Sequence, residues 1–335
     1  MRIGYFGDGQ WANAALERIL ATKWMEVAYI VARYPYPDPV MAAWAEKLDI
    51  PFFSLPDVND QQFCDQVRQF TPDINVSMSF DQIIRRRLLD IAPMGFINCH
   101  AGALPFYRGR NILNWALINA EQNFGVTVHY VDEGIDTGDI IAQQIVSIEE
   151  HDTYASLLEK AVAHCADLLP EVLAKLAAGT AERIPQKTIH PVGTYFGRRQ
   201  PGDEMIDWSR PSREIHGFVR ALVPPGPCAR TAWKDTLIGI VATQLIPDAP
   251  CYREVPGRVV GRDKSGVVVK TGDSSIRVTG IVRLVKNDLC QQVEIPAFTV
   301  GTRFAGGAEL RIREIERRIS LLEDYILASQ NVVNQ

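Results

Sequence analysis

The chain has 335 residues, of which 47% are hydrophobic and 22% charged, and its formal net charge is −5. This length predicts two domains, each large enough to bury a core. The acidic balance disfavours nucleic acid as the main partner, because proteins that bind it usually carry a basic surplus. Six cysteines lie without a Cys-x-x-Cys pair, so neither disulfides nor a metal site is expected. The longest apolar run, 237–242, is far short of the roughly 20 residues that span a bilayer. With no secretory leader visible, we expect a cytoplasmic protein without a membrane partner.

Up to about residue 180, short apolar segments alternate with amphipathic ones. Strands are predicted at 1–6, 27–31, 52–53, 74–78, 96–98, 126–131 and 140–146, and helices after residue 9 and at 40–48, 60–70 and 153–178. Strands that alternate with helices favour right-handed crossovers and a mostly parallel sheet. The sequence therefore predicts a Rossmann-like α/β domain in this part of the chain.

Beyond residue 200 the predicted elements become a helix and several short strands. The helix is expected at 212–222 and the strands at 229–233, 237–242, 258–260, 267–270 and 276–281. The segment Thr271-Gly272-Asp273-Ser274 predicts a hairpin turn between the last two. Short strands at this spacing are typical of a small barrel or sandwich.

The tail from Ala308 to Ser329 has the pattern of a helix. Its apolar residues step alternately by three and four positions, as at a helix–helix seam: Ile312, Ile315, Ile319, Leu322 and Ile326. A seam this short fits equally well a helix that packs against its own chain and a helix that packs against a second copy. We predict a homodimer.

A glycine-rich turn follows the first predicted strand. The segment from Gly7 to Ala12 fits G-x-G-x-x-A, the fingerprint of dinucleotide binding. The acidic residue that would bind a ribose is absent, because Ala32 and Arg33 stand at the end of the second strand. A nicotinamide cofactor is one interpretation of this turn, and a turn that serves some other ligand is the alternative.

Polar residues that suit acyl transfer gather after the fifth predicted strand. Asn98 and His100 alternate along it and so face the same side of the sheet, whereas Cys99 faces the other layer. Asp136 lies in a glycine-flanked turn that could bring its carboxylate to His100. An amide can steady an oxyanion, an imidazole can move a proton, and a carboxylate can orient the imidazole. A substrate amine could then attack directly, without a protein nucleophile.

These residues are part of a longer pattern that resembles a known family. The pattern comprises Asn98-Cys99-His100, Leu104-Pro105-Phe106-Tyr107-Arg108-Gly109, Gly125-Val126-Thr127 with His129, and Asp136-Thr137-Gly138. It is similar to the signature of the formyltetrahydrofolate-dependent formyltransferases. Gly102 stands where that family has a serine, a departure that the loop should tolerate. The resemblance implies an enzyme that uses 10-formyltetrahydrofolate as co-substrate, with Asn98, His100 and Asp136 as catalytic residues.

The resemblance covers nearly the whole chain and implies further assignments. The segments are a catalytic Rossmann-like domain at 1–203, an OB-like β-barrel domain at 204–300, and a C-terminal helix at 301–335 that could contact a second subunit. Folate is expected at Phe80, Gln82, Ile83, Ile84, Asp132, Gly134 and Ile135, although Phe80 and Ile83 could also be simple core. The acceptor is expected at Asp8, Trp11, Tyr107, Arg108, Arg198 and Arg199. The last two could pair with a pyrophosphate or form an ordinary surface pair.

The acceptor amine distinguishes the members of this family. Segment 33–39 is short and almost uncharged where tRNA-formylating members carry a basic insertion, so tRNA binding would lack its main electrostatic contribution. Purine-pathway members have a single domain. The chain is most similar to the formyltransferase part of the enzyme that acts on UDP-4-amino-4-deoxy-L-arabinose. It shares Arg108-Gly109-Arg110, Leu113-Asn114-Trp115 and Phe196-Gly197-Arg198-Arg199 with that enzyme.

The chain also resembles stand-alone sugar formyltransferases of O-antigen biosynthesis, and no decarboxylase half follows. We therefore predict that the substrate is a nucleotide-linked 3- or 4-amino deoxysugar for surface polysaccharide or lipopolysaccharide. Methionyl-tRNA formyl transfer is the alternative. A formyltetrahydrofolate hydrolase, a nicotinamide-dependent oxidoreductase and a non-catalytic folate-binding regulator also remain open.

Overall fold

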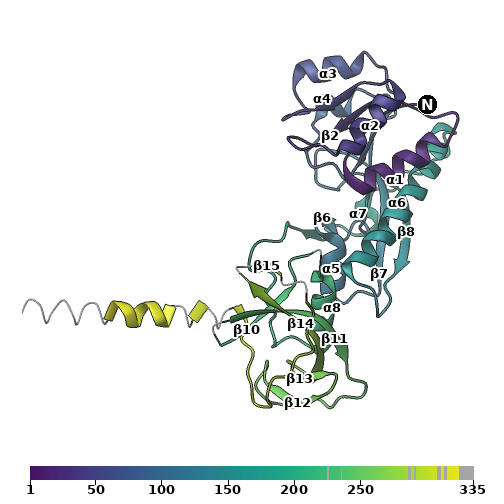
Figure 1. The fold of residues 1–335 in the computed structure, drawn as a ribbon. Coiled ribbons are helices and arrows are strands. Elements are labelled where there is room, and N and C mark those ends of the chain that lie inside the picture. Colours follow the sequence, from purple (N-terminus) through teal and green to yellow (C-terminus); the bar gives the residue numbers. More distant parts are fainter. Residues whose placement is uncertain are drawn as a thin grey trace, which may run out of the picture. The chain divides into compact units, whose positions relative to one another are not determined.

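The computed structural model describes residues 1–224, 226–234, 236–285, 288–289, 292–307, 311–312 and 315–323. Contacts between residues divide the chain into two compact units (Figure 1). The N-terminal unit comprises residues 1–116, 121–152 and 156–198, and the C-terminal unit comprises 117–120, 153–155 and the chain from Arg199 onwards. Each unit is built around its own large sheet.

Seven strands form the sheet of the N-terminal unit, in the order β3-β2-β1-β4-β5-β7-β8. They are β1 (Arg2–Gly7), β2 (Glu26–Ala32), β3 (Phe52–Ser54), β4 (Ile74–Met78), β5 (Phe96–His100), β7 (Asn123–Tyr130) and β8 (Ile140–Ser147). The first five in this order run parallel, and β7 and β8 join them antiparallel. The predicted mostly parallel sheet is confirmed. The carboxyl ends of the parallel strands share one edge, where open α/β sheets place ligands.

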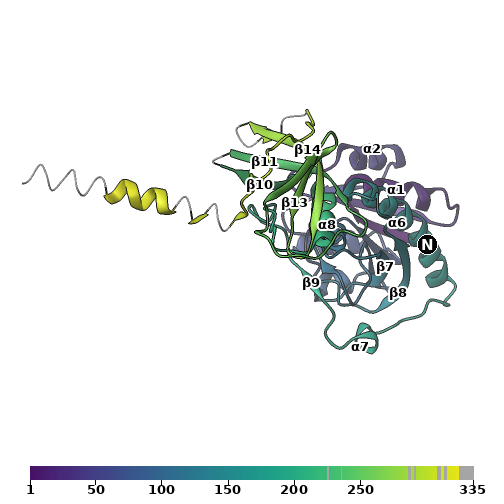
Figure 2. The ribbon, with the colours of Figure 1, turned by 90° about the horizontal axis from the view of Figure 1, so that it is seen from below.

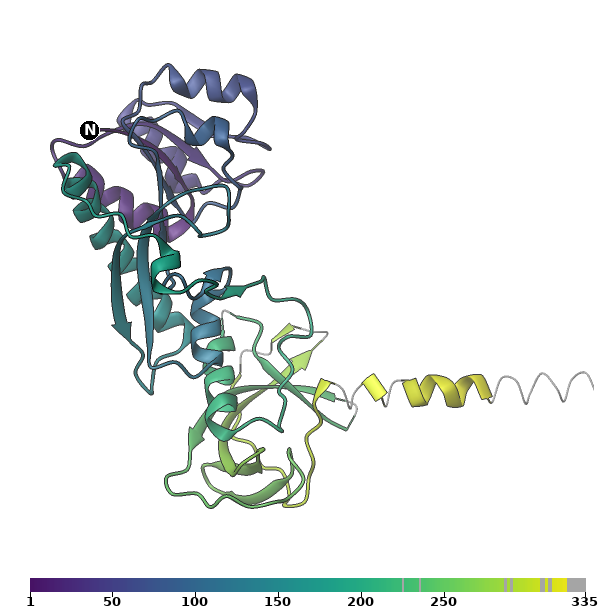
Figure 3. The same cartoon turned by 180° about the vertical axis from the view of Figure 1, so that it is seen from behind.

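Helices cover both faces of this sheet (Figure 3). On one face lie α1 (Gly9–Leu20), α2 (Pro39–Leu48) and α6 (Tyr154–Ala177), and on the other lie α3 (Gln61–Arg68) and α4 (Arg86–Leu89). An ion pair of 3.0 Å between Arg18 and Asp167 joins α1 to α6. Asp38 and Asp60 cap α2 and α3, because their carboxylates accept backbone N–H groups that have no partner inside the helix.

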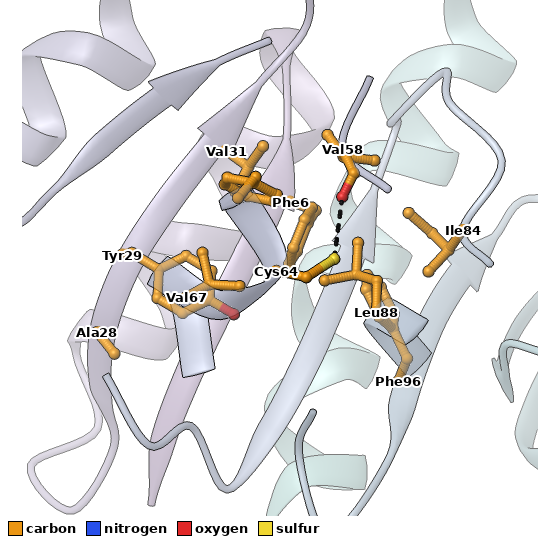
Figure 4. Close-up of a cluster of buried hydrophobic side chains, with 11 residues drawn as sticks. Phe6, Ala28, Tyr29, Val31, Val58, Cys64, Val67, Ile84, Leu88 and Phe96 are labelled. Atoms are coloured by element: carbon orange, nitrogen blue, oxygen red, sulfur yellow. Dashed lines mark hydrogen bonds between the residues drawn. The ribbon is translucent and has the colours of Figure 1, made fainter. Parts of the chain in front are cut away.

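The face under α3 and α4 is an aromatic core (Figure 4). Phe6 on β1 lies between Tyr29 on β2 and Phe96 on β5, with ring centroids 6.0 Å and 4.9 Å away. Cys64 of α3 points into the same cluster, where its thiol lies 3.7 Å from the Val58 carbonyl oxygen. Burying each such large apolar side chain contributes about 1.5–3 kcal/mol. This core fixes the strands whose ends carry the polar residues.

Several short elements of the N-terminal unit are not evident in the sequence. They are α4, α5 (Ile112–Ile118), α7 (Gln186–Ile189), β6 (Arg108–Gly109) and β9 (Tyr195–Phe196). β6 and β9 pair in parallel, with Arg108 opposite Tyr195. This pairing brings the segment 184–196, called the strap below, beside the loop that follows β5. Elements of two to seven residues are too short to show a hydrophobic period, which explains why the sequence pattern missed them.

The C-terminal unit is an antiparallel sheet with one long helix against it (Figure 2). Its elements are α8 (Ser212–Leu222), β10 (Ala229–Trp233), β11 (Thr236–Leu245), β12 (Val259–Asp263), β13 (Gly266–Lys270), β14 (Ser275–Val285) and β15 (Asp288–Leu289). The order is β10-β11-β14-β13-β12, and β15 pairs with β14. Ala305 bridges to Ala232 at one edge, and Arg303 bridges to Arg258 beside the other. One segment therefore links both edges, as in a small barrel.

The tail is helical at residues 311–312 and 315–323. Ile312, Ile315, Ile319 and Leu322 are each about half exposed or more, between 49% and 61%. Ile326 lies outside the described residues. No helix in the described part of the chain is both long and apolar enough to cross a bilayer.

Candidate active site

Asn98 and His100 lie at the carboxyl end of β5 and share one side of the sheet, as their spacing predicts. In the register with β7, Asn98 stands opposite His129 and His100 stands opposite Thr127. Cys99 is buried on the other layer, where its thiol contacts Cys165 of α6. The alternation along the strand thus separates a polar, ligand-facing row from the core.

Asp136 bridges the two histidines. Its Oδ2 lies 3.6 Å from Nδ1 of His100, and its Oδ1 lies 3.5 Å from Nε2 of His129. Oδ2 also accepts the backbone N–H of Gly109 at 2.8 Å. Asp136 has a φ of 52°, a left-handed conformation that aspartate tolerates better than most residues. The predicted meeting of Asn98, His100 and Asp136 is present, and His129 completes it.

Hydrogen bonds to carbonyl groups fix which nitrogen of each imidazole carries its proton. Nε2 of His100 lies 2.7 Å from the carbonyl oxygen of Tyr107, and Nδ1 of His129 lies 2.7 Å from that of Tyr130. A carbonyl can only accept, so both of these nitrogens donate. In the neutral rings, Nδ1 of His100 and Nε2 of His129 are therefore bases.

The same argument orients the Asn98 side chain. Its amide nitrogen lies 3.2 Å from Nε2 of His129, which in the neutral ring can only accept. The Asn98 NH₂ group therefore faces His129 and donates one hydrogen to it. Its second hydrogen makes no hydrogen bond within the described part of the chain and can be offered to a ligand.

Burial and charge set the protonation states. Burial lowers the pKa of His100, and the Asp136 carboxylate and the Tyr107 carbonyl only partly reverse this effect. Burial would raise the pKa of Asp136, but His100, His129 and the Gly109 N–H outweigh it and hold that pKa well below its usual range. Near neutral pH the site therefore contains a carboxylate beside a neutral imidazole base. No group of three or more His, Cys, Asp or Glu among the described residues is arranged to hold a metal ion.

Gly102 allows the loop after β5 to close on His100. A Cβ atom at this position would lie 2.4 Å from the Tyr107 carbonyl oxygen and 2.5 Å from Nε2 of His100. The hydroxyl of Thr127 donates to the Gly102 carbonyl at 2.6 Å, and Gln143 of β8 donates to the Leu104 carbonyl at 2.9 Å. The glycine that departs from the family pattern thus sits where the loop packs directly against His100.

A cavity of about 350 Å³ lies beside the turn that ends at Asp136. Phe96, Tyr130, Val131, Asp132 and Glu133 are among its lining residues. Ile97 of β5 pairs with Tyr130 of β7, so the cavity is at the start of β5 and His100 at its end. The turn from Asp132 to Asp136 connects the two.

The residues predicted to bind folate divide into buried and exposed members. Ile84 and Phe80 pack on the aromatic core, whereas Ile83 is 60% exposed and Ile135 46% exposed. The side chain of Gln82 is bound within the protein, to the Val58 N–H and the Leu55 carbonyl. Asp132 lines the cavity, and its Oδ1 accepts the N–H of Gly134 at 3.0 Å. These assignments stay predictions.

Most residues predicted to bind the acceptor hold the protein's own loops. Oδ2 of Asp8 accepts the N–H groups of Arg33 and Asp38, which ties down the segment after β2. Tyr107 donates its hydroxyl to Glu121 at 2.5 Å, and Arg108 donates to Gln186.

The other three acceptor candidates differ in their surroundings. Trp11 on α1 is half-buried. Arg198 is exposed at the end of the N-terminal unit, and Arg199 donates to the Asp203 carbonyl in the C-terminal unit. The acceptor assignments also stay predictions.

Sequence reasoning gave His129 no role and missed Gln186 altogether. His129 belongs to the quoted motif, and its position opposite Asn98 could have been inferred from strand pairing. Gln186 lies in the strap, about 50 residues beyond Asp136, and no local pattern marks it.

Comparison with known proteins assigns this chain to one family. The model for formyl transferase matches residues 1–173, and the model for the formyl transferase C-terminal domain matches residues 199–292. The chain belongs to the formyl transferase family. Formyl transfer is the activity that this membership supports, and the α/β fold followed by an antiparallel C-terminal domain agrees with it.

The names of the relatives and the contents of the solved structures involve different acceptors. Methionyl-tRNA formyltransferase of Acetivibrio thermocellus is 29% identical over 92% of this chain and 99% of its own, and that of Clostridioides difficile is 31% identical over 84% and 92%. An N-formyltransferase of Helicobacter canadensis, solved with folinic acid and dTDP-3-aminofucose, has a TM-score of 0.64 at 21% identity over 83% of this chain and 98% of that one. WlaRD, a sugar 3N-formyltransferase solved with dTDP and 5-N-formyltetrahydrofolate, has a TM-score of 0.63 at 19% identity. The match covers 87% of this chain and 98% of WlaRD. At these identities the structures show a shared fold.

Proposed function

We propose that this enzyme transfers a formyl group from 10-formyltetrahydrofolate to the amine of a nucleotide-linked amino deoxysugar. The observation that carries the formyl transfer step is the bridge that Asp136 makes between His100 and His129, with Asn98 held by His129. In the neutral ring it leaves Nδ1 of His100, beside Asp136, as a base, and it leaves one Asn98 N–H without a partner among the described residues. These are the groups that amide formation from an amine needs.

The tautomers of His100 and His129 determine which atoms give and take protons during the transfer. The acceptor nitrogen attacks the formyl carbon and forms a C–N bond, and the formyl oxygen takes the negative charge. Asn98 donates its second N–H to this oxygen, while Nδ1 of His100 takes the proton that the amine loses. Asp136 stabilises the imidazolium so formed. Collapse breaks the bond between the formyl carbon and N10 of tetrahydrofolate, and N10 receives the proton.

The cavity beside the Asp132–Asp136 turn supports a folate co-substrate. It is concave and partly apolar, with Val131 offering apolar contact and Asp132 and Glu133 offering acceptors for ring N–H groups. The Helicobacter and WlaRD structures were solved with folinic acid and with 5-N-formyltetrahydrofolate respectively, which is consistent with a folate at this fold. A ring in the cavity would lie along the same strand as His100.

The segment after β2 supports a small acceptor. Its one cation, Arg33, turns inward and donates to the carbonyl and hydroxyl of Ser79. Residues 34–39 contain no lysine or arginine that could neutralise phosphates of a tRNA acceptor stem. The sugar-nucleotide complex of the Helicobacter protein agrees with such an acceptor at this fold. A nucleotide-linked 3- or 4-amino deoxysugar for surface polysaccharide fits these features.

Methionyl-tRNA is the second candidate, and two observations favour it. Curated relatives between 29% and 31% identical carry that name and match nearly the whole chain. The sequence from Arg199 onwards also holds slightly more lysine and arginine than aspartate and glutamate, against an acidic excess before it. Such a balance gives a polyanion a modest attraction to the C-terminal part.

A parallel transfer assay tests both candidates. The protein is incubated with 10-formyltetrahydrofolate and either dTDP-, UDP- and GDP-linked 3- and 4-amino deoxysugars or methionyl-tRNA at several salt concentrations. Mass spectrometry should find one formyl group added to one sugar, and the Asn98→Ala and His100→Ala variants should abolish the gain. Formylation of methionyl-tRNA alone, with a rate that falls steeply with salt, would replace the sugar by the tRNA.

The exposed apolar residues of the tail support a homodimer. Ile312, Ile315 and Ile319 follow one helical seam and are each about half exposed. Light scattering at micromolar concentration should give the mass of a dimer. A monomer mass would contradict this assignment without affecting the transfer reaction.

A further inference from the structure

Gln186 is a buried glutamine whose amide is fully used. The residue is 2% exposed and begins α7 in the strap. Its Nε2 donates to the Asp136 carbonyl at 2.8 Å and to the Gly138 carbonyl at 2.7 Å. Its Oε1 accepts from Nε of Arg108 at 3.0 Å and from Nη2 of Arg108 at 2.7 Å. Two donors and two acceptor sites are all that a carboxamide has.

These four bonds join three segments that are far apart in the sequence. Asp136 and Gly138 belong to the turn after β7, Arg108 belongs to the loop after β5, and Gln186 comes from the strap. The Gly109 N–H, next to Arg108, donates to the Asp136 carboxylate. The turn that carries Asp136 is therefore held at its backbone by Gln186 and at its side chain by Gly109.

The backbone of Asp136 needs such a hold. Its left-handed φ of 52° is less favourable for a residue with a side chain than for glycine, so the surrounding structure must impose it. The Asp136 carboxylate lies only 3.6 Å from His100, so a change of this backbone conformation would move it away from the imidazole. The two residues are 36 positions apart in the sequence, so local chain geometry alone does not hold them together.

We infer that Gln186 is a positioning residue for catalysis, which sets the place of the Asp136 carboxylate beside His100 and couples it to the Arg108 loop. It acts through Asp136 and contacts no reacting atom. The inference rests on the proposed catalytic role of Asp136. The strap is therefore part of the catalytic machinery, although it lies beyond the motif that identifies the site.

Two variants distinguish the role of the Gln186 donor atom, Nε2, from that of its acceptor atom, Oε1. Gln186→Glu keeps oxygen acceptors for Arg108 but loses both donors to the Asp136 and Gly138 carbonyls. Gln186→Met removes all four hydrogen bonds at similar volume. If the bonds to the turn carry the effect, both variants should lower kcat/KM by about tenfold to a hundredfold, as expected when a catalytic group is misplaced by about 1 Å.

The titration of His100 supplies a measurement that does not depend on the acceptor. The Asp136 carboxylate raises the pKa of His100. Displacing it should lower that pKa in Gln186→Met, which adds no charge of its own, toward the value in Asp136→Asn. Histidine-labelled protein followed by NMR over pH 4–8 measures this directly. If the wild-type protein formylates none of the acceptors, the proposed function fails, and the titration alone still decides whether Gln186 positions Asp136.

Tyr29→Phe is the matched control for a loss of stability. It removes a buried hydrogen bond from Tyr29 to Asn75 in the same unit, outside the catalytic loops. It should lower the melting temperature and leave kcat/KM and the His100 titration unchanged. The inference is overturned if both Gln186 variants behave like Tyr29→Phe, with lower stability but a wild-type His100 pKa and wild-type kcat/KM.

Discussion

Asp136 in the N-terminal unit and Asp273 in the C-terminal unit each organise a polar cluster, and the two clusters differ in what surrounds the carboxylate. Asp136 in the N-terminal unit faces two imidazoles and one backbone N–H. Oδ1 of Asp273 in the C-terminal unit accepts two backbone N–H groups and two hydroxyls, from Ser212, Thr271 and Ser274. In both, burial opposes ionisation and hydrogen bonds or charges outweigh it, so the pKa of each carboxyl is lowered.

A lowered carboxyl pKa therefore does not by itself mark a catalytic site in this chain. The partners of Asp273 neither titrate near neutral pH nor leave a base exposed, so its cluster can only hold α8 to the turn after β13. The partners of Asp136 include a neutral imidazole that can take a proton, so its cluster can do chemistry. The nature of the partners, and the atoms that they leave open, distinguishes the two.

The largest expected effect comes from breaking the Asp136 cluster. His100→Ala removes the base and should lower kcat/KM for formyl transfer by about 10²–10⁴-fold. Asn98→Ala removes an oxyanion donor and should lower kcat by about 10²–10³-fold. Steady-state kinetics with the acceptor that the transfer assay identifies measures both.

The matched control for these variants lies in the other unit. Asp273→Ala breaks a cluster of similar size there and should leave kcat unchanged. Near-wild-type rates in His100→Ala would contradict the assignment of the base.

The next largest effect is expected at Gly102, where the loop closes on His100. Gly102→Ser places a Cβ at 2.4–2.5 Å from the Tyr107 carbonyl oxygen and Nε2 of His100, so one of them must move. We expect a fall in kcat/KM of about tenfold to a hundredfold, because the hydrogen bond that fixes the His100 tautomer is lost. Gly9→Ser is the control for backbone strain alone, since a Cβ there meets nothing within 4 Å but its φ of 72° is left-handed, unlike that of Gly102. Equal effects at the two glycines would mean that loop strain, and not His100, is responsible.

How well the sequence predicts a structural feature depends on how far apart in the sequence the contacting residues lie. Long elements with a clear period were predicted closely: α8 spans 212–222 and β10 spans 229–233, as expected. The meeting of Asn98, His100 and Asp136 was also predicted, because strand alternation and the family pattern both pointed to it. The domain boundary near residue 203 and the dimer seam stay predictions.

Residues whose partners are distant in the sequence could not be assigned. Arg108 stays a predicted substrate contact, and no local pattern shows that its guanidinium also holds Gln186, which lies 78 positions away. Gln82 stays a predicted folate residue, and no local pattern shows that its side-chain amide holds the segment near Val58. A local pattern shows that a polar residue lies in a loop, but the fold decides whether it faces a ligand or a neighbouring loop.

The pH dependence should show a smaller effect with a defined sign. Burial lowers the pKa of His100 below its usual value of about 6.5. The base must be unprotonated, so kcat/KM should stay level as pH falls to about 6.5 and decline only below it. Asp136→Asn removes the charge that raises this pKa, so the decline should begin at a still lower pH while the plateau rate drops. A decline that begins above pH 6.5 would show that another group titrates.

The smallest effect is expected at Asp273, and it concerns stability alone. Asp273 accepts the N–H of Ser212, the first residue of α8, which has no partner inside the helix. Asp273→Ala should cost about 1 kcal/mol, as loss of a helix cap does, and lower the melting temperature by about 2–4 °C. Asp167→Ala removes a carboxylate that holds only an exposed ion pair with Arg18, and should change stability by less than about 0.5 kcal/mol. If Asp273→Ala lowered kcat as well as the melting temperature, the C-terminal cluster would be coupled to catalysis, and the distinction drawn from its partners would fail.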